Sequence, residues 1–180
     1  MIGIIERLLL SVMYNGVGQY MGKDITKIDW ENMTFSFRET DKMYISTCKK
    51  DGEWSEGKIQ DFQNLNISPA AGVLNYGQGL FEGMKAYRTV DGSVVLFRPE
   101  ENAKRMQKGA RRLGIPEVPE DMFLDAVIRT VKENARWIPP IGKGTLYIRP
   151  LLMGSGAILG VAPAPEYTFL VYVSPVGPYF

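Results

Sequence analysis

The sequence predicts an α+β fold in which two helices cover one antiparallel sheet. Four β-rich segments fall into two pairs around Asp-Gly dipeptides, and two amphipathic stretches follow them. These elements alternate too irregularly for a run of βαβ units, and no internal repeat is visible. With 45% hydrophobic and 23% charged residues, the chain has enough apolar material to bury a core.

Two β-hairpins are expected, each around an Asp-Gly pair. This dipeptide tolerates the positive φ that a tight turn demands, and the flanking residues favour extended backbone. The hairpins are predicted at residues 34–47 with 58–67, around Asp51-Gly52, and at residues 83–89 with 93–97, around Asp91-Gly92.

The first helix is predicted to begin at Pro99. Proline suits the first helical turn because its missing N–H has no intrahelical partner there, and Glu100 and Glu101 complement the helix dipole. Gly114 can adopt the left-handed conformation that ends a helix. The apolar stripe that faces the sheet consists of Ala103, Met106, Ala110 and Leu113.

A second helix is predicted over residues 120–137, where Pro139-Pro140 stops it. Two strands follow at residues 145–152 and 167–174, separated by a loop rich in Gly and Pro at residues 154–165. The helix face that packs on the sheet is expected to contain Phe123, Ala126, Val127, Thr130 and Val131.

Charge and composition exclude several kinds of protein. The 21 basic residues nearly cancel the 20 acidic ones, which disfavours a nucleic-acid partner. The absence of histidine removes the commonest zinc ligand and general base, and the lone Cys48 cannot form a metal site or an internal disulfide. No run of about 18 apolar residues is present to span a membrane. We expect Cys48 to be a half-buried residue of the strand-like run 43–49 in a reducing compartment.

Both ends of the chain differ from the middle. Residues 1–19 have apolar positions at helical spacing but match a signal or transit peptide poorly, so a short helical extension is predicted, with an atypical organelle-targeting segment as the alternative. The last residues follow a strand directly, which indicates an interruption rather than a domain end. A cytoplasmic location is expected for the chain as given.

A glycine-rich stretch, residues 76–83 (YGQGLFEG), invites a nucleotide-loop interpretation. A dinucleotide fingerprint requires a strand before the glycines and a helix after them, and this stretch instead leads into a strand. A close approach of turn and strand backbones explains the glycines more simply.

Residues 71–87 (AGVLNYGQGLFEGMKAY) resemble, nearly residue for residue, the branched-chain amino-acid aminotransferase family, particularly its plant members. The resemblance continues in residues 96–106 (LFRPEENAKRM) and 146–150 (LYIRP) and covers about residues 20–180. It implies the small N-terminal domain of a pyridoxal-phosphate (PLP) enzyme of fold type IV, the D-amino-acid-aminotransferase-like class. The implied limits are 1–19 for an extension, 20–175 for the small domain and 176–180 for the start of a connection to an absent large domain.

The resemblance also assigns roles to six residues. Arg105 matches an arginine that reaches the cofactor phosphate, although periodicity alone reads it as a solvated helix residue. The period of two places Tyr147 and Arg149 on one face of a strand. They match family residues that recognise the substrate α-carboxylate, partly across a dimer interface. The simpler alternative is that this face of the sheet is exposed to water. The aromatic residues that match a pocket for an aliphatic side chain, with core packing as the alternative, are Phe35, Tyr76 and Phe81.

The implied reaction transfers an amino group between leucine, isoleucine or valine and 2-oxoglutarate, in a homodimer that uses pyridoxal 5'-phosphate. In the family the Schiff-base lysine lies in the second domain, so Lys85, despite its place in the strongest motif, is not assigned that role. The chain alone is therefore expected to be inactive. A non-catalytic dimerisation module and another fold type IV enzyme, a D-amino-acid aminotransferase or an aminodeoxychorismate lyase, are the alternatives. A plant-like resemblance also implies a plastid or a mitochondrion as the compartment.

Overall fold

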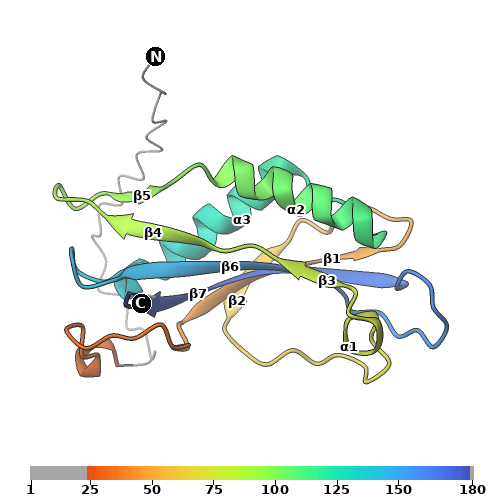
Figure 1. Cartoon of the computed structure of the whole chain (residues 1–180), viewed down its shortest axis with the longest axis horizontal. Helices are drawn as coiled ribbons and strands as arrows, with labels where there is room; N and C mark the ends of the chain where they lie inside the picture. The colour runs from red at the N-terminus through yellow and green to blue at the C-terminus, as the bar shows by residue number, and fades with distance from the viewer. Residues whose placement is uncertain (1–23, 179–180) are drawn as a thin grey trace, which may run out of the picture.

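A seven-stranded antiparallel sheet forms the centre of the protein in a computed structural model, which describes residues 24–178 (Figure 1). The strand order is β2-β1-β7-β6-β4-β5, and β3 also pairs with β6. The predicted helix at residues 1–19 lies outside the described residues, as do residues 179–180. The strands are β1 (Lys42–Lys49), β2 (Lys58–Asp61), β3 (Gly79–Phe81), β4 (Met84–Arg88), β5 (Val94–Leu96), β6 (Thr145–Gly154) and β7 (Glu166–Val176).

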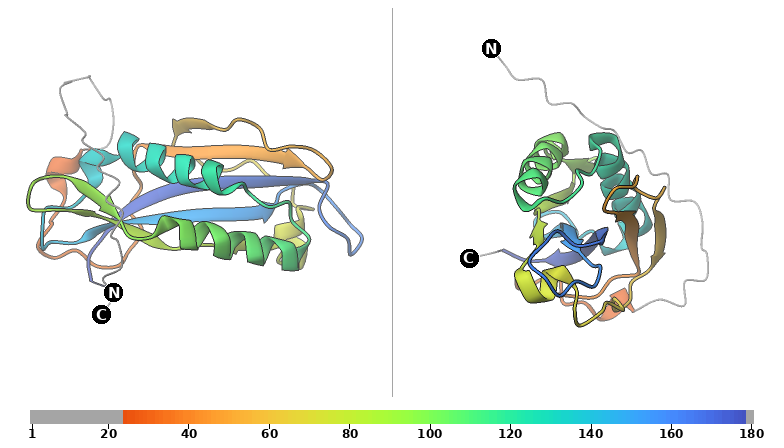
Figure 2. Two further views of the ribbon diagram at one scale, coloured as in Figure 1. Left: turned by 90° about the horizontal axis from the view of Figure 1, so that it is seen from above. Right: turned by 90° about the vertical axis from the view of Figure 1, so that its right-hand side faces the viewer.

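Helices α2 (Pro99–Leu113) and α3 (Glu120–Glu133) lie side by side on one face of this sheet, which confirms the predicted α+β architecture (Figure 2). Helix α2 has the predicted bounds, and Gly114 ends it with φ of 63°. Helix α3 stops at Glu133 and a 3-10 turn, Ala135–Trp137, follows it, so the prediction of one helix to residue 137 was wrong at its end. The helix ends here because the Asn134 side chain turns to the sheet and bonds the backbone of Asp41 and Lys42, at the start of β1.

The hairpin around Asp91-Gly92 is confirmed: β4 pairs with β5, and Gly92 has φ of 82°. The other hairpin is confirmed as a pairing of β1 with β2, but the predicted strands, residues 34–47 and 58–67, extend beyond the observed ones. Residues 34–41 are not a strand, because their backbone bonds side chains and loops, as when Arg38 N–H donates to Ser174 Oγ. Residues 62–67 leave the strand because Phe62 and Leu65 pack onto the sheet face opposite the helices.

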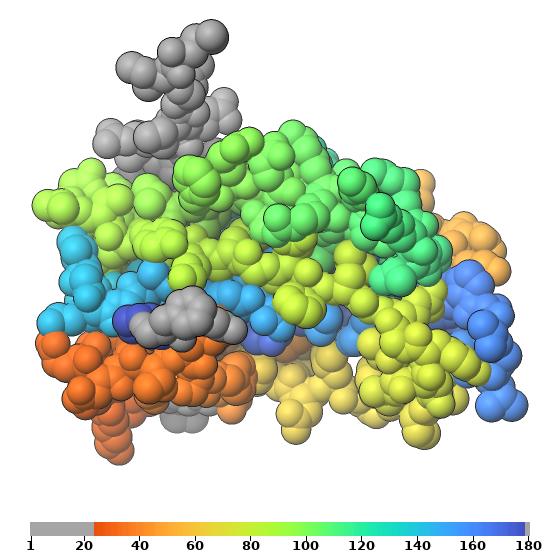
Figure 3. All heavy atoms as spheres, in the orientation of Figure 1, coloured from red at the N-terminus to blue at the C-terminus, as the bar shows by residue number. Residues whose placement is uncertain are grey.

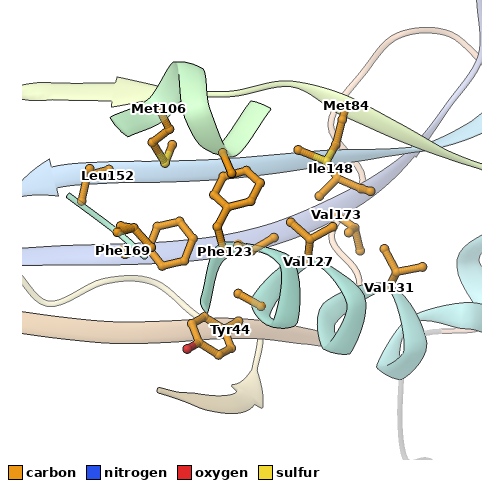
Figure 4. Close-up of a cluster of buried hydrophobic side chains, with 14 of the residues drawn as sticks. Tyr44, Met84, Met106, Phe123, Val127, Val131, Ile148, Leu152, Phe169 and Val173 are labelled. Carbon is orange, nitrogen blue, oxygen red and sulfur yellow. The ribbon is translucent and has the colours of Figure 1, made fainter. Parts of the chain in front are cut away.

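The main core lies between the two helices and the sheet (Figure 4). Phe123 of α3 stacks on Phe169 of β7 with 6.0 Å between ring centroids, and Met106 of α2 is fully buried beside them. Burying a side chain of this size contributes about 1.5–3 kcal/mol. Leu146, Ile148 and Leu152 of β6 face the helices, as the period of two predicted.

The opposite sheet face is only partly covered. A smaller apolar cluster there contains Met43, Met153 and Leu170, with Phe62 and Leu65 packed against it. The segments 24–41 and 62–71 run along this face in Figure 1. The segment 62–71 leads into α1 (Gly72–Tyr76), a one-turn helix that the sequence analysis did not predict. The half-covered face is where a strand can present polar side chains.

Candidate active site

Tyr147 and Arg149 of β6 lie on the sheet face opposite the two helices. Both are partly exposed, whereas their neighbours Leu146, Ile148 and Pro150 are buried, so the predicted alternation is confirmed. The Arg149 guanidinium donates to the Tyr147 hydroxyl, with 3.0 Å from Nη2 and 3.3 Å from Nε. This pair of contacts fixes the direction in which the guanidinium points.

Two aromatic rings adjoin this arginine and tyrosine. The Arg149 guanidinium carbon lies 4.1 Å from the centroid of the Phe81 ring, in a cation–π contact. The Phe35 ring meets Tyr147 edge to face at 5.3 Å, although the two residues are 112 positions apart in the sequence. The structure therefore brings four of the predicted residues together. A fixed cation beside exposed aromatic rings can bind a carboxylate that carries an apolar group.

Tyr76 stands apart from these four within residues 24–178. It ends α1, is 42% exposed, and donates its hydroxyl to the backbone carbonyl of Leu159. Leu159 and Val161, in the loop between β6 and β7, are each 91% exposed. Tyr76 thus belongs to a second exposed apolar group, next to that loop.

Arg105 lies on α2, and its side chain is 67% exposed. Its Nε and Nη2 donate to the two carboxylate oxygens of Glu82, at 2.7 and 2.5 Å. The hydrogen bonds and charge of Glu82 raise the pKa of Arg105 above its usual value. The guanidinium is therefore a permanent cation, held from one edge and open to solvent on the other.

Glu82 and Gly83 separate β3 from β4. This two-residue segment contacts Arg105 through the Glu82 carboxylate and approaches the Tyr147 hydroxyl, which bonds Arg149, through Gly83. The Glu82 N–H donates to Pro150 O at 2.9 Å, which keeps the segment paired to β6. A side chain at Gly83 would collide with the Tyr147 hydroxyl, so glycine lets the backbone approach without displacing that hydroxyl. In Figure 3 the yellow-green residues of β3 and β4 lie between green α2 and blue β6.

Glu82, Gly83 and Asn102 were not among the predicted site residues. Asn102 donates from Nδ2 to Glu82 Oε2 at 2.8 Å and to Gly83 O at 3.3 Å. The signal was available in part, because Asn102 and Arg105 are spaced i,i+3 on one helix face and Glu82 stands in the strongest motif. Their contact with each other, across about 20 positions, could not be read from that spacing.

Other features of residues 24–178 do not give a better candidate site. A hollow of about 1300 Å³ lies between β1, β2 and residues 63–68, and none of the six predicted site residues lines it. Those residues contain no group of three or more His, Cys, Asp or Glu side chains placed to hold a metal ion. No helix in the described part of the chain is long and apolar enough to cross a bilayer.

The fold is that of the small domain of fold type IV aminotransferases. A solved branched-chain amino acid aminotransferase of Escherichia coli superposes with a TM-score of 0.63 and 22% identity, over 78% of this chain and 41% of that one. The branched-chain aminotransferase of the archaeon Thermoproteus uzoniensis gives 0.62 and 23%, over 78% and 42%. At this identity the likeness shows the fold.

The sequence resembles plant enzymes more closely. The chain is 61% identical over 157 residues to the chloroplastic branched-chain-amino-acid aminotransferase 5 of Arabidopsis thaliana, and 62% identical over 157 residues to the chloroplastic aminotransferase 2 of Humulus lupulus. Each match covers 87% of this chain and 38% of the relative, so the chain spans about two fifths of their length. No family model matches the chain. The resemblance to plant branched-chain aminotransferases is confirmed.

Proposed function

We propose that residues 20–175 are the small domain of a PLP-dependent branched-chain amino-acid aminotransferase. The enzyme exchanges the amino group between leucine, isoleucine or valine and 2-oxoglutarate. The observation that carries the proposal is the connection of two differently held arginines through one backbone segment, Glu82-Gly83. Arg149 lies beside aromatic walls and suits a substrate carboxylate, whereas Arg105 lies behind the segment and suits a phosphate.

Arg105 fits the phosphate end of the cofactor. It carries a permanent charge and keeps N–H groups that Glu82 does not use. When bound, PLP supplies the carbonyl and the electron-withdrawing ring through which an amino group is transferred. In the resembled family the lysine that carries PLP belongs to a second domain. We therefore expect these 180 residues alone to be inactive.

Tyr147 and Arg149 bind the α-carboxylate in this proposal, and Phe35 and Phe81 adjoin the aliphatic side chain, whereas Tyr76, bonded to the loop at Leu159, is not part of this group. Arg149 is already oriented by the Tyr147 hydroxyl, so little freedom is lost on binding. An apolar wall excludes charged side chains but distinguishes one methylene by only about 1–3 kcal/mol. Selectivity among leucine, isoleucine and valine should therefore be weak.

A homodimer and an organelle complete the proposal. Leu159 and Val161 are almost fully exposed beside Tyr76, and exposed apolar groups of this kind mark protein interfaces. Two of the relatives' names include "chloroplastic" and another, from Humulus lupulus at 55% identity, includes "mitochondrial". We propose one of these two compartments for the complete protein.

A chimera tests the proposed activity. The matching 157-residue region of the Arabidopsis aminotransferase 5 is replaced by the corresponding residues of this chain, and amine donors are assayed with 2-oxoglutarate. The donors are leucine, isoleucine and valine, with D-alanine for comparison. Methionine is added because one relative at 51% identity is named a methionine aminotransferase. We expect activity on the three branched donors, lost in an Arg149→Met variant. Activity restricted to D-alanine would assign the domain to another fold type IV enzyme.

The unmodified 180-residue chain gives the second arm. After incubation with PLP and borohydride, we expect only scattered labelling of exposed lysines and no stoichiometric pyridoxyl label on a single lysine, Lys85 included. A stable label on one lysine, together with transamination by the chain itself, would contradict the proposed division between two domains. Self-association without chimera activity would instead favour a non-catalytic dimerisation module.

A further inference from the structure

Glu82 is a buried carboxylate in an unusual place. Its residue is only 5% exposed, yet it lies beside the arginine to which the proposed function assigns an anionic ligand. Both carboxylate oxygens are occupied: Oε1 accepts from Arg105 Nε, and Oε2 accepts from Arg105 Nη2 and Asn102 Nδ2. The Asn102 side chain also donates to Gly83 O, so the carboxylate is held from two directions.

This arrangement determines which edge of the Arg105 guanidinium remains available. A guanidinium has five N–H donors, and the fork formed by Nε and Nη2 points at Glu82. The free edge is formed by Nη1 and the second hydrogen of Nη2. It faces away from the carboxylate and has the planar geometry that accepts two oxygens of one phosphate. The side chain is 67% exposed, so its own packing does not fix this direction.

We propose that Glu82, supported by Asn102, is a positioning residue that fixes the Arg105 guanidinium with its free edge toward a phosphate group. The inference rests on the proposed function, in which Arg105 receives that phosphate. A long exposed arginine otherwise loses conformational freedom when it binds an anion. The bidentate contact with Glu82 removes that freedom in advance.

A simpler role for Glu82 predicts the opposite result. If the carboxylate only balanced the charge of Arg105, it would repel a phosphate, and its removal would strengthen phosphate binding. If it positions the guanidinium, its removal weakens phosphate binding although the site becomes more positive. The sign of one change in affinity therefore separates the two roles.

The experiment uses the 180-residue chain labelled with ¹⁵N and titrated with inorganic phosphate at constant ionic strength. The Arg105 Nε–Hε resonance, assigned by its loss in Arg105→Lys, reports both hydrogen exchange with water and phosphate binding. In the unmodified chain we expect slow exchange and a saturable shift of this resonance. In Glu82→Gln we expect fast exchange and a phosphate affinity about five- to tenfold weaker, the size expected for the net loss of one ordinary hydrogen bond.

Glu101→Gln is the matched control. It also removes one negative charge, here from the helix that carries Arg105, but Glu101 pairs with Lys104 and Arg98 rather than with Arg105. We expect unchanged Arg105 exchange and an affinity that is equal or slightly tighter. Asn102→Ala supplies a second variant if Glu82→Gln does not give a folded amide spectrum. It keeps the carboxylate, frees it on one side, and should weaken phosphate binding about two- to threefold.

Three results are decisive. Tighter or equal phosphate binding in Glu82→Gln, or Arg105 exchange unchanged from the unmodified chain, overturns the positioning role and leaves the proposed function standing. In a third outcome, the Arg105 Nε–Hε of the unmodified chain is protected from exchange but does not respond to phosphate. That result contradicts the phosphate role of Arg105, and with it both proposals. Faster exchange together with weaker binding supports the inference.

Discussion

Asn134→Ala should destabilise the fold strongly. Asn134 is fully buried, and its Oδ1 accepts from the backbone N–H groups of Asp41 and Lys42, each at 3.0 Å. Its Nδ2 donates to the carbonyls of Lys42 and Thr130, at 3.0 and 2.8 Å. The alanine variant leaves two N–H groups and the Lys42 carbonyl without these partners. At about 1–3 kcal/mol for each group that water does not reach, we expect a loss of about 3–5 kcal/mol.

Urea unfolding followed by tryptophan fluorescence measures this loss, with unchanged m values as the check on two-state behaviour. Asn75→Ala is the matched control, because Asn75 is exposed although its amide also donates to two carbonyls, of Pro69 and Ala71. We expect less than about 1 kcal/mol for the control. Equal midpoints for the two variants would show that Asn134 does not join α3 to β1 as described.

Three further outcomes are expected. Gly83→Ala should cost about 1–3 kcal/mol in the same urea assay, because the new methyl group displaces the Tyr147 hydroxyl; a wild-type midpoint would contradict the close approach. Burial raises the pKa values of Tyr44, Tyr167 and Cys48 above their ordinary 10.0 and 9.0, so the native state holds these protons longer than the unfolded chain. Stability should therefore be full below about pH 9 and fall as pH rises through the raised values, and Tyr44→Phe should make that decline shallower in urea midpoints compared at about pH 8 and 10.5. Iodoacetamide should label Cys48 slowly in the native chain and rapidly in urea; equal rates would place the thiol at the surface.

The sequence predicted those elements that depend on residues close to one another along the chain. The alternation along β6 follows from local hydrophobicity, and the caps of α2, Pro99 and Gly114, act within one turn. The end of α3 was not predictable in this way, because it depends on the bonds of Asn134 to a strand more than 90 positions earlier.

The candidate site was also predictable only in part, where it depends on local pattern or on the family resemblance. Strand period placed Tyr147 and Arg149 on one face, and the family resemblance pointed to Phe35, Phe81 and Arg105. Neither source predicted that Tyr76 would bond the loop at Leu159 instead of joining the other aromatic rings. Nor did they predict the Glu82 contact with α2, because the periodicity of a strand says nothing about which residue of a distant helix it meets.

The interruption between β3 and β4 has a consequence for redesign. Both strands pair with β6, and the two residues between them touch one arginine through a carboxylate and the other through a tyrosine hydroxyl. Changes at positions 82 and 83 would thus disturb the surroundings of Arg105 and Arg149 at once. If the proposed function holds, a redesign for a new amine donor should leave that pair intact and vary Phe35, whose ring meets that of Tyr147 edge to face.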